Sequence, residues 1–160
     1  YFLTNDLDNC GDEAVRRQAL SGDELRGLLA KIPSGATLLL FDTCSSGTYG
    51  STAHLDLKAA VRRFEQLDGR LLLAAAGDRQ MALESPFGQR GIFTTVVIDG
   101  LTGKADSSRD RVVKATELLT YVLETVPEVT ERQFRVRQDP YGSFQGGGAF
   151  PLTRVGAGRP

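Results

Sequence analysis

The stretch "LLLFDTCSSG", residues 38–47, joins an uninterrupted apolar run to an aspartate, a cysteine and a small, flexible loop. The run "ATLLLF" (36–41) predicts a strand, and "LLLAAA" (71–76) predicts a second one. Strands that are apolar on both faces belong in a parallel sheet that is covered by helices. The sequence therefore predicts an α/β domain in which Asp42 and Cys44 come directly after a buried strand.

Helical patterns alternate with these strands, as in other α/β domains. The segment "SGDELRGLLAKI" (21–32) has apolar residues at helical spacing, opens with a capping box of Ser21 and Glu24, and is ended by "PSG" (33–35). Three more helices are predicted: "HLDLKAAVRRFEQLD" (54–68), "GIFTTVVIDGL" (91–101), and a helix from about Glu117 to near Pro127.

The remaining segments are less regular. "RQFRVRQ" (132–138) alternates polar and apolar residues, which predicts an edge strand or an extended segment. The glycine-rich "SFQGGGAFPL" (143–152) is typical of a loop. The polar "GKADSSRDR" (103–111) is typical of a flexible connector or a processing site, and "GAGRP" (156–160) of a tail or linker.

Composition excludes several classes of partner. A chain of 160 residues is expected to form one domain with a sizeable core. The net charge of -1 and the pI near 5.9 give no reason to expect nucleic acid or a membrane surface as partner. No apolar run approaches the roughly 18 residues that span a bilayer. Because Cys10 and Cys44 have unlike surroundings, we expect no disulfide framework and a cytoplasmic location.

Cys44 has a position that suits chemistry. Ligands of open parallel sheets bind outside the carboxyl ends of the strands, and Cys44 follows such an end. The next predicted strand delivers Gly77 and Asp78 to the same edge, and the loop 45–47 is small enough for a substrate backbone to approach. A buried, inert thiol is the alternative. The position and the flanking residues favour a reactive thiol over it.

Several kinds of thiol chemistry do not fit the residues. A tyrosine-phosphatase loop needs an arginine where Gly50 stands, and a redox pair needs a cysteine where Gly47 stands. Zinc would need ligands from Cys10, Cys44 and His54, which have no metal-like spacing. A hydrolase nucleophile elbow needs a glycine where this chain has an aspartate. A cysteine nucleophile that is served by a histidine elsewhere in the fold remains.

The motif D-x-C-x-S-G in 38–47 resembles the catalytic-cysteine strand and loop of caspase-like peptidases, the group of caspases, metacaspases and bacterial orthocaspases. The motif departs from the Q-A-C-x-G signature of animal caspases and is similar to the metacaspase-like, prokaryotic side of the group. The resemblance covers nearly the whole chain. It includes "YFLTND" (1–6), "LSGDELRGLLAKIPSG" (20–35), the strand, acidic loop and helix of 71–106, "TELLTYVLETVPEVT" (116–130), "RQDP" (137–140) and "FPL" (150–152).

The resemblance implies a caspase-like fold, a mainly parallel sheet flanked by helices on both faces. Residues 1–155 would form the C-terminal, larger part of a peptidase domain. It also implies a cysteine endopeptidase that acts on proteins or peptides, with Cys44 as nucleophile and its own amide in the oxyanion site. Asp42 would line the pocket for the residue ahead of the cut, where a carboxylate suits arginine or lysine. The alternative for Asp42 is a structural role, bonding to loop amides.

The partner histidine of the resemblance does not fall within this chain. Caspases place it about 50 residues before the cysteine, a position that lies before Tyr1. His54, the only histidine, follows the cysteine and opens a predicted helix, so we interpret it as a surface residue. We therefore expect the base on a separate or removed N-terminal fragment, and this chain alone to be incomplete. The alternative is a caspase-like regulatory module that binds without cutting, and fused regulatory domains fit either reading.

Some metacaspases bind calcium, and the resemblance places Asp6 and Asp23 at ligand positions. The third expected acid is Ser51 here, so we expect no cofactor. Asp23 is equally well explained by the preference for acids at a helix start. Asp78 and Glu84 are interpreted either as residues at the rim of the pocket or as solvated loop charges.

Overall fold

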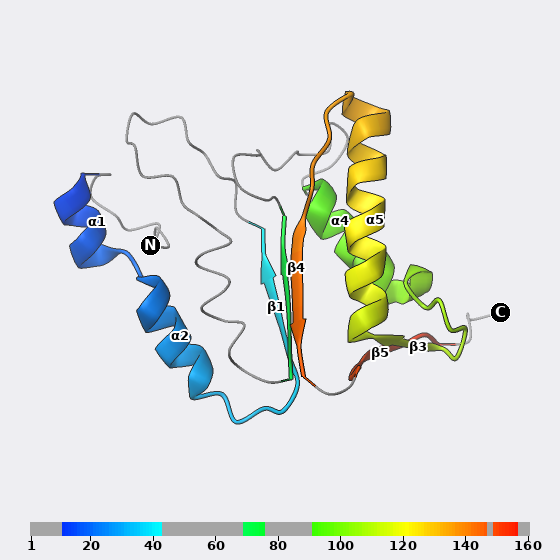
Figure 1. Cartoon of the computed structure of the whole chain (residues 1–160), viewed down its shortest axis with the longest axis horizontal. Coiled ribbons are helices and arrows are strands. Elements are labelled where there is room, and N and C mark those ends of the chain that lie inside the picture. The colour runs from blue at the N-terminus through cyan, green and yellow to red at the C-terminus, as the bar shows by residue number, and fades with distance from the viewer. Residues whose placement is uncertain (1–10, 43–68, 76–90, 147–148, 157–160) are drawn as a thin grey trace. The chain divides into compact units, whose positions relative to one another are not determined.

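The computed structural model of the protein describes residues 11–42, 69–75, 91–146 and 149–156. The chain forms two compact units, Tyr1–Ser34 and Gly35–Pro160. The described parts are of mixed α/β type, with helices and a small mixed sheet (Figure 1). The segment 1–6 of the family resemblance and the helix predicted at 54–68 lie outside the described residues.

The described part of the first unit, residues 11–34, contains two short helices. α1 (Asp12–Gln18) was not predicted, whereas α2 (Gly22–Ala30) confirms the helix expected after Ser21. Its capping box is present, since Ser21 Oγ accepts the Glu24 amide at 3.2 Å and Glu24 Oε2 accepts the Ser21 amide at 2.8 Å. Hydrogen bonds from the Ser21 hydroxyl and amide hold the pKa of Glu24 below its usual value. Local capping chemistry thus fixes where α2 begins.

In its described residues, the second unit is built on a three-stranded sheet with the order β1-β2-β4 (Figure 1). β1 (Thr37–Phe41) pairs in parallel with β2 (Arg70–Ala74), in a register that sets Phe41 beside Ala74. β4 (Tyr141–Gln145) pairs with β2 in the antiparallel direction. The sequence predicted a mainly parallel sheet. The described sheet is mixed because the chain returns along β2 in the opposite direction.

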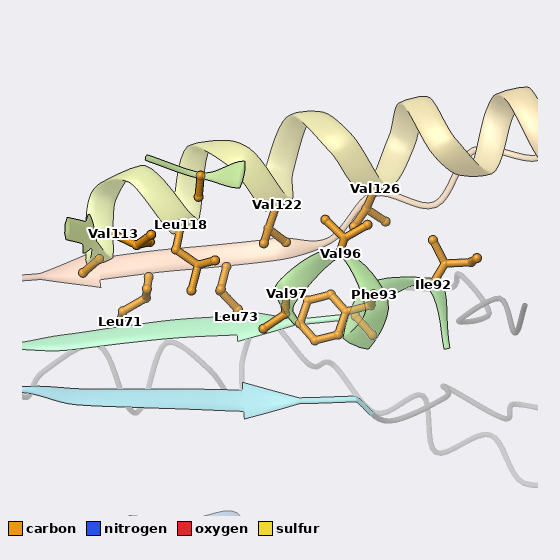
Figure 2. Close-up of a cluster of buried hydrophobic side chains, with 13 residues drawn as sticks. Leu71, Leu73, Ile92, Phe93, Val96, Val97, Val113, Leu118, Val122 and Val126 are labelled. Atoms are coloured by element: carbon orange, nitrogen blue, oxygen red, sulfur yellow. The ribbon is translucent and has the colours of Figure 1, made fainter. Parts of the chain in front are cut away.

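β2 is the centre of the core. All of its residues are buried, and the exposed fractions of Leu71 and Leu73 are 0%. Figure 2 shows both leucines pointing towards side chains of α4 (Ile92–Asp99) and α5 (Ala115–Phe134). β1 was also expected to be buried on both faces, but Leu40 is 45% exposed. Of the two parallel strands, therefore, β2 alone has the burial of a central strand.

α5 does not end near Pro127, as the sequence predicted, but continues to Phe134. A proline inside a helix removes one backbone hydrogen bond and costs about 3 kcal/mol or more. Here the next turn is held by buried Thr130, whose hydroxyl donates to the carbonyls of Val126 at 3.0 Å and Pro127 at 3.2 Å. Thr130 Oγ1 also accepts the Gln138 amide at 3.0 Å. Tertiary packing overrides the local helix-breaking signal.

β4 lies partly where the sequence predicted the loop 143–152, and the segment 132–138 is the end of α5 followed by irregular chain. The loop prediction rested on the glycines at 146–148, which come after β4 in the sequence, whereas Gly142 belongs to the strand. A Cβ at this position would come within 2.3 Å of Leu119 in α5 and 3.1 Å of Leu73 in β2. The missing side chain lets the helix and the sheet approach closely. This glycine serves packing, although its neighbours suggested a loop.

The C-terminal part forms a second, two-stranded sheet. β3 (Val112–Lys114) pairs with β5 (Pro151–Arg154) in the antiparallel direction. α4 confirms the helix predicted at 91–101. The last two residues of the predicted range lie in the distorted turn η1 (Gly100–Lys104). Gly103 in this turn has a φ of 126°, a backbone conformation that glycine adopts without strain.

The polar segment 103–111 was predicted to be flexible, but carboxylates hold it in a defined turn. Asp106 accepts the amides of Asp110 at 3.2 Å and Arg111 at 2.9 Å. The Asp110 carboxylate in turn accepts a hydrogen bond from the ammonium group of Lys114. Aspartates often bond to amides of their own turn, yet composition alone does not show which amides they reach.

Glu117 fastens the start of α5 to the same turn. Its Oε1 accepts the Ser108 amide at 2.9 Å and the Ser107 hydroxyl at 3.1 Å, and its Oε2 accepts the Lys114 amide at 2.9 Å. Partial burial disfavours the charged form, but the hydrogen bonds outweigh it and lower the pKa of Glu117 from 4.5 to about 2. The ionised carboxylate therefore holds the turn.

We expect Glu117→Gln to destabilise the protein at neutral pH by about 1–3 kcal/mol, because one amide oxygen cannot replace two hydrogen-bonded carboxylate oxygens. A pKa that is lowered in the folded state stabilises above the ordinary pKa, and this contribution is lost as the pH falls through the folded value. The difference in the free energy of unfolding between wild type and variant should therefore shrink as the pH falls from 4.5 to about 2. Urea unfolding at several pH values measures it.

The matched control is Glu124→Gln, at an exposed position of the same helix. It should change stability by less than about 0.5 kcal/mol. A Glu117→Gln difference that does not vary with pH would contradict the role of the charged form.

Candidate functional site

The ends of β1 and β2 share one edge of the sheet, as the sequence predicted. Phe41 pairs with Ala74, and one residue further the Ala75 amide donates to the Phe41 carbonyl at 2.8 Å. Asp42 follows Phe41 directly and is exposed. The carboxyl ends of parallel strands are where α/β sheets place their ligand sites. We call this edge, made of Phe41, Asp42, Ala74 and Ala75, the carboxyl-end rim.

α4 begins beside the same rim. Asp42 Oδ2 accepts a hydrogen bond from the hydroxyl of Thr94, the third residue of α4. Gly91, at the N-cap of α4, has no side chain to cap the helix. A carboxylate near the first turn interacts favourably with the positive end of a helix. The rim thus combines the end of a strand, the start of a helix and an exposed carboxylate.

A buried glutamine anchors the other side of the rim. Gln138 is 1% exposed, and its Nε2 donates to the carbonyl of Ala75 at 2.5 Å. The backbone amide of Gln138 donates to Thr130 Oγ1 in α5. Gln138 therefore ties the end of β2 to the chain that follows α5. A buried amide side chain must find such partners, since an unpaired one would be costly.

Sequence reasoning missed Thr94, Thr130 and Gln138 as parts of this edge. Thr94 and Thr130 sit inside helical patterns, and Gln138 sits in a segment rich in charged residues. Thr94 and Gln138 have partners that are remote in sequence, since Thr94 is 52 residues from Asp42 and Gln138 is 63 from Ala75. No local signal in one sequence marks such pairs.

Most of the predicted site residues lie outside the described residues: Cys44, the loop 45–47, Gly77, Asp78, Glu84, His54, Asp6 and Ser51. Asp23 is described, and it lies in the first turn of α2, where its Oδ1 is 3.7 Å from Nη2 of Arg26. Within the described ranges, no group of three or more His, Cys, Asp or Glu side chains could hold a metal ion. Asp42 is thus the predicted site residue that can be placed at the rim.

The chemistry of Asp42 is that of a cation acceptor. One of its oxygens is held by Thr94, and none of the other described residues donates a hydrogen bond to it. A carboxylate held in this way can accept further hydrogen bonds from a guanidinium or an ammonium group.

No family model, curated protein or solved structure matches this chain. Among the described helices, none has the length and apolar character needed to cross a membrane. The function is therefore inferred from the residues of the chain itself.

We expect Gln138→Leu to destabilise the protein by about 1–3 kcal/mol, because a side chain of similar volume leaves the Ala75 carbonyl without its donor. Thermal or urea unfolding measures the loss. Gln133→Leu, at an exposed position near the end of α5, is the matched control and should have little effect. Equal stability of the two variants would show that the hydrogen bond between Gln138 and Ala75 contributes nothing.

Proposed function

We propose that the protein is a caspase-like cysteine endopeptidase that cuts proteins after arginine or lysine. The observation that supports this best is the placement of Asp42, exposed at the carboxyl-end rim beside the start of α4. Cys44 follows two residues later in the sequence. Substrate sites of α/β folds occur at such edges, and the D-x-C-x-S-G motif gives the edge a nucleophile and an acid.

The proposed specificity rests on charge. An arginine side chain that enters a partly desolvated pocket forms charge-assisted, often bidentate hydrogen bonds with a carboxylate. An aspartate in the same place would meet a like charge and would lose its hydration without compensation. Asp42 is therefore proposed to select arginine or lysine as the residue ahead of the cut and to reject acidic residues.

The proposed reaction has two steps. In the first, the Cys44 thiolate attacks the peptide carbonyl to form a tetrahedral oxyanion, whose collapse breaks the carbon–nitrogen bond and leaves a thioester on Cys44. A histidine from outside these 160 residues takes the thiol proton and gives it to the leaving amine. In the second, water cleaves the thioester and restores the thiol. The Cys44 amide, with an amide near that histidine, stabilises the oxyanion.

Two things support the caspase-like assignment beyond the motif. The described residues of the second unit are of mixed α/β type, and in them β1, β2 and α4 follow one another in the order that the sequence likeness requires. In addition, β1 and β2 run in parallel, so both deliver the following residues to one edge. A non-cutting regulatory module of the same family would share these features. Peptide cleavage that is lost when Cys44 is replaced distinguishes a peptidase from a non-cutting module.

We expect Cys44→Ala to abolish peptide cleavage by the complete protein, with the catalytic histidine segment supplied, because no other group replaces the nucleophile. Cys10→Ala is the matched control and should keep wild-type activity. Hydrolysis of a fluorogenic arginine peptide measures both. Cleavage by Cys44→Ala at the wild-type rate would end the assignment of this cysteine, and an inactive wild-type complex would support the non-cutting module.

We expect Asp42→Ala to lower kcat/KM for arginine substrates by at least about tenfold, since it removes a charge-assisted pair. Asp42→Asn keeps the shape of the side chain and removes only its charge, so kcat/KM for arginine substrates should fall by a similar factor. Peptides that differ only at the residue before the cut measure the effect. A preference for aspartate in wild type, or an unchanged arginine preference in both variants, would assign Asp42 to structure.

A further inference from the structure

We propose that Thr94 is a positioning residue that orients Asp42 for arginine or lysine recognition. This inference rests on the proposed function and adds to it a residue that lies in α4, outside the cysteine motif. Its basis is the hydrogen bond from the Thr94 hydroxyl to Asp42 Oδ2, which joins α4 to the end of β1.

Two adjacent threonines in α4 use their hydroxyls differently. The Thr95 hydroxyl donates to the Gly91 carbonyl at 3.0 Å, the local bond that threonine usually makes inside a helix. The Thr94 hydroxyl instead reaches a carboxylate that lies 52 residues away in the sequence. Thr94 therefore makes a tertiary contact at the rim, while Thr95 makes a contact that serves only the helix.

Thr94 is itself held firmly. The residue before it, Phe93, is 1% exposed and belongs to the core that α4 shares with α5 and β2 (Figure 2). Val97, three residues further on, is 3% exposed and packs in the same core. A β-branched side chain in a helix also has few rotamers available. A hydroxyl fixed in this way can hold an exposed carboxylate in one orientation.

Fixing Asp42 matters because an exposed aspartate side chain otherwise rotates. A hydrogen bond to one oxygen restricts the rotation of the carboxylate plane and leaves the remaining lone pairs available to a guanidinium. A bidentate contact depends on that plane, so preorganising it lowers the entropic cost of binding. The hydroxyl hydrogen bond is therefore expected to contribute to discrimination between charged and neutral side chains.

A purely structural bond between α4 and β1 would have a different signature. Its loss would lower stability and affect all substrates alike, whatever residue precedes the cut. A positioning role changes the ratio of kcat/KM between an arginine peptide and the same peptide with citrulline, which has nearly the same shape without the charge. That ratio is the readout.

The experiment uses the complete protein and four variants: Thr94→Val, Thr94→Ser, Thr95→Val and Asp42→Ala. Thr94→Val keeps the branched shape without the hydroxyl and should lower the arginine-to-citrulline ratio about three- to tenfold. Thr94→Ser keeps a hydroxyl and should restore most of the ratio. Thr95→Val removes the neighbouring hydroxyl and should leave the ratio unchanged. In an Asp42→Ala background, Thr94→Val should have no further effect on the ratio.

Melting temperatures of all variants accompany the kinetics, so that unfolding is recognised. The positioning role is wrong if Thr94→Val lowers kcat/KM equally for the arginine and citrulline peptides. It is also wrong if Thr94→Val keeps the wild-type ratio while Asp42→Ala loses it. In both cases the proposed peptidase function stands. If the wild-type protein shows no preference for arginine over citrulline, the proposed specificity fails and the role of Thr94 fails with it.

Discussion

The parallel pairing of β1 with β2 is the constraint on which the rest of the second unit depends. β2 is buried along its whole length, so its backbone groups need partners on both sides, and β1 and β4 provide them. The parallel direction also decides where the chain leaves the sheet. Phe41 and Ala74 end their strands side by side, and the residues after each must emerge at one edge. Asp42, directly after β1, acquires its location from this pairing.

The antiparallel strand β4 joins the described sheet because α5 carries the chain to the end of β2 at which β4 begins. Its 20 residues span about 30 Å and bring the chain to the carboxyl-end rim, where Tyr141 pairs with Ala74 (Figure 1). Gln138 fixes this return through its bond to Ala75, and Gly142 lets α5 lie close to the sheet. The rim is therefore supported by the same contacts that close the core. A change in the α5–β4 connection would alter the hydrogen bond that Gln138 donates to the Ala75 carbonyl.

The sequence predicted those features that depend on local pattern. The two apolar runs marked β1 and β2 to within about two residues, and the Ser21 capping box marked the start of α2. Prediction from the sequence failed where contacts with distant residues decide the local structure. α5 passes Pro127 because Thr130 and its neighbours are buried against the rest of the unit. At the candidate site, the position of Asp42 after a strand was predictable, but its hydroxyl donor was not, since nothing near Asp42 in sequence specifies Thr94.

The acidic side chains of the second unit show two different uses of a carboxylate. Asp106 and Glu117 each accept at least two backbone amides and hold a turn, and for Glu117 this network lowers its pKa to about 2. Asp42 accepts one side-chain hydroxyl from the described residues and remains exposed to solvent. A carboxylate with saturated oxygens has little capacity left for a ligand, whereas one oriented by a single donor retains most of it. Asp42 therefore retains a capacity to accept hydrogen bonds from a cationic side chain that Asp106 and Glu117 have largely used.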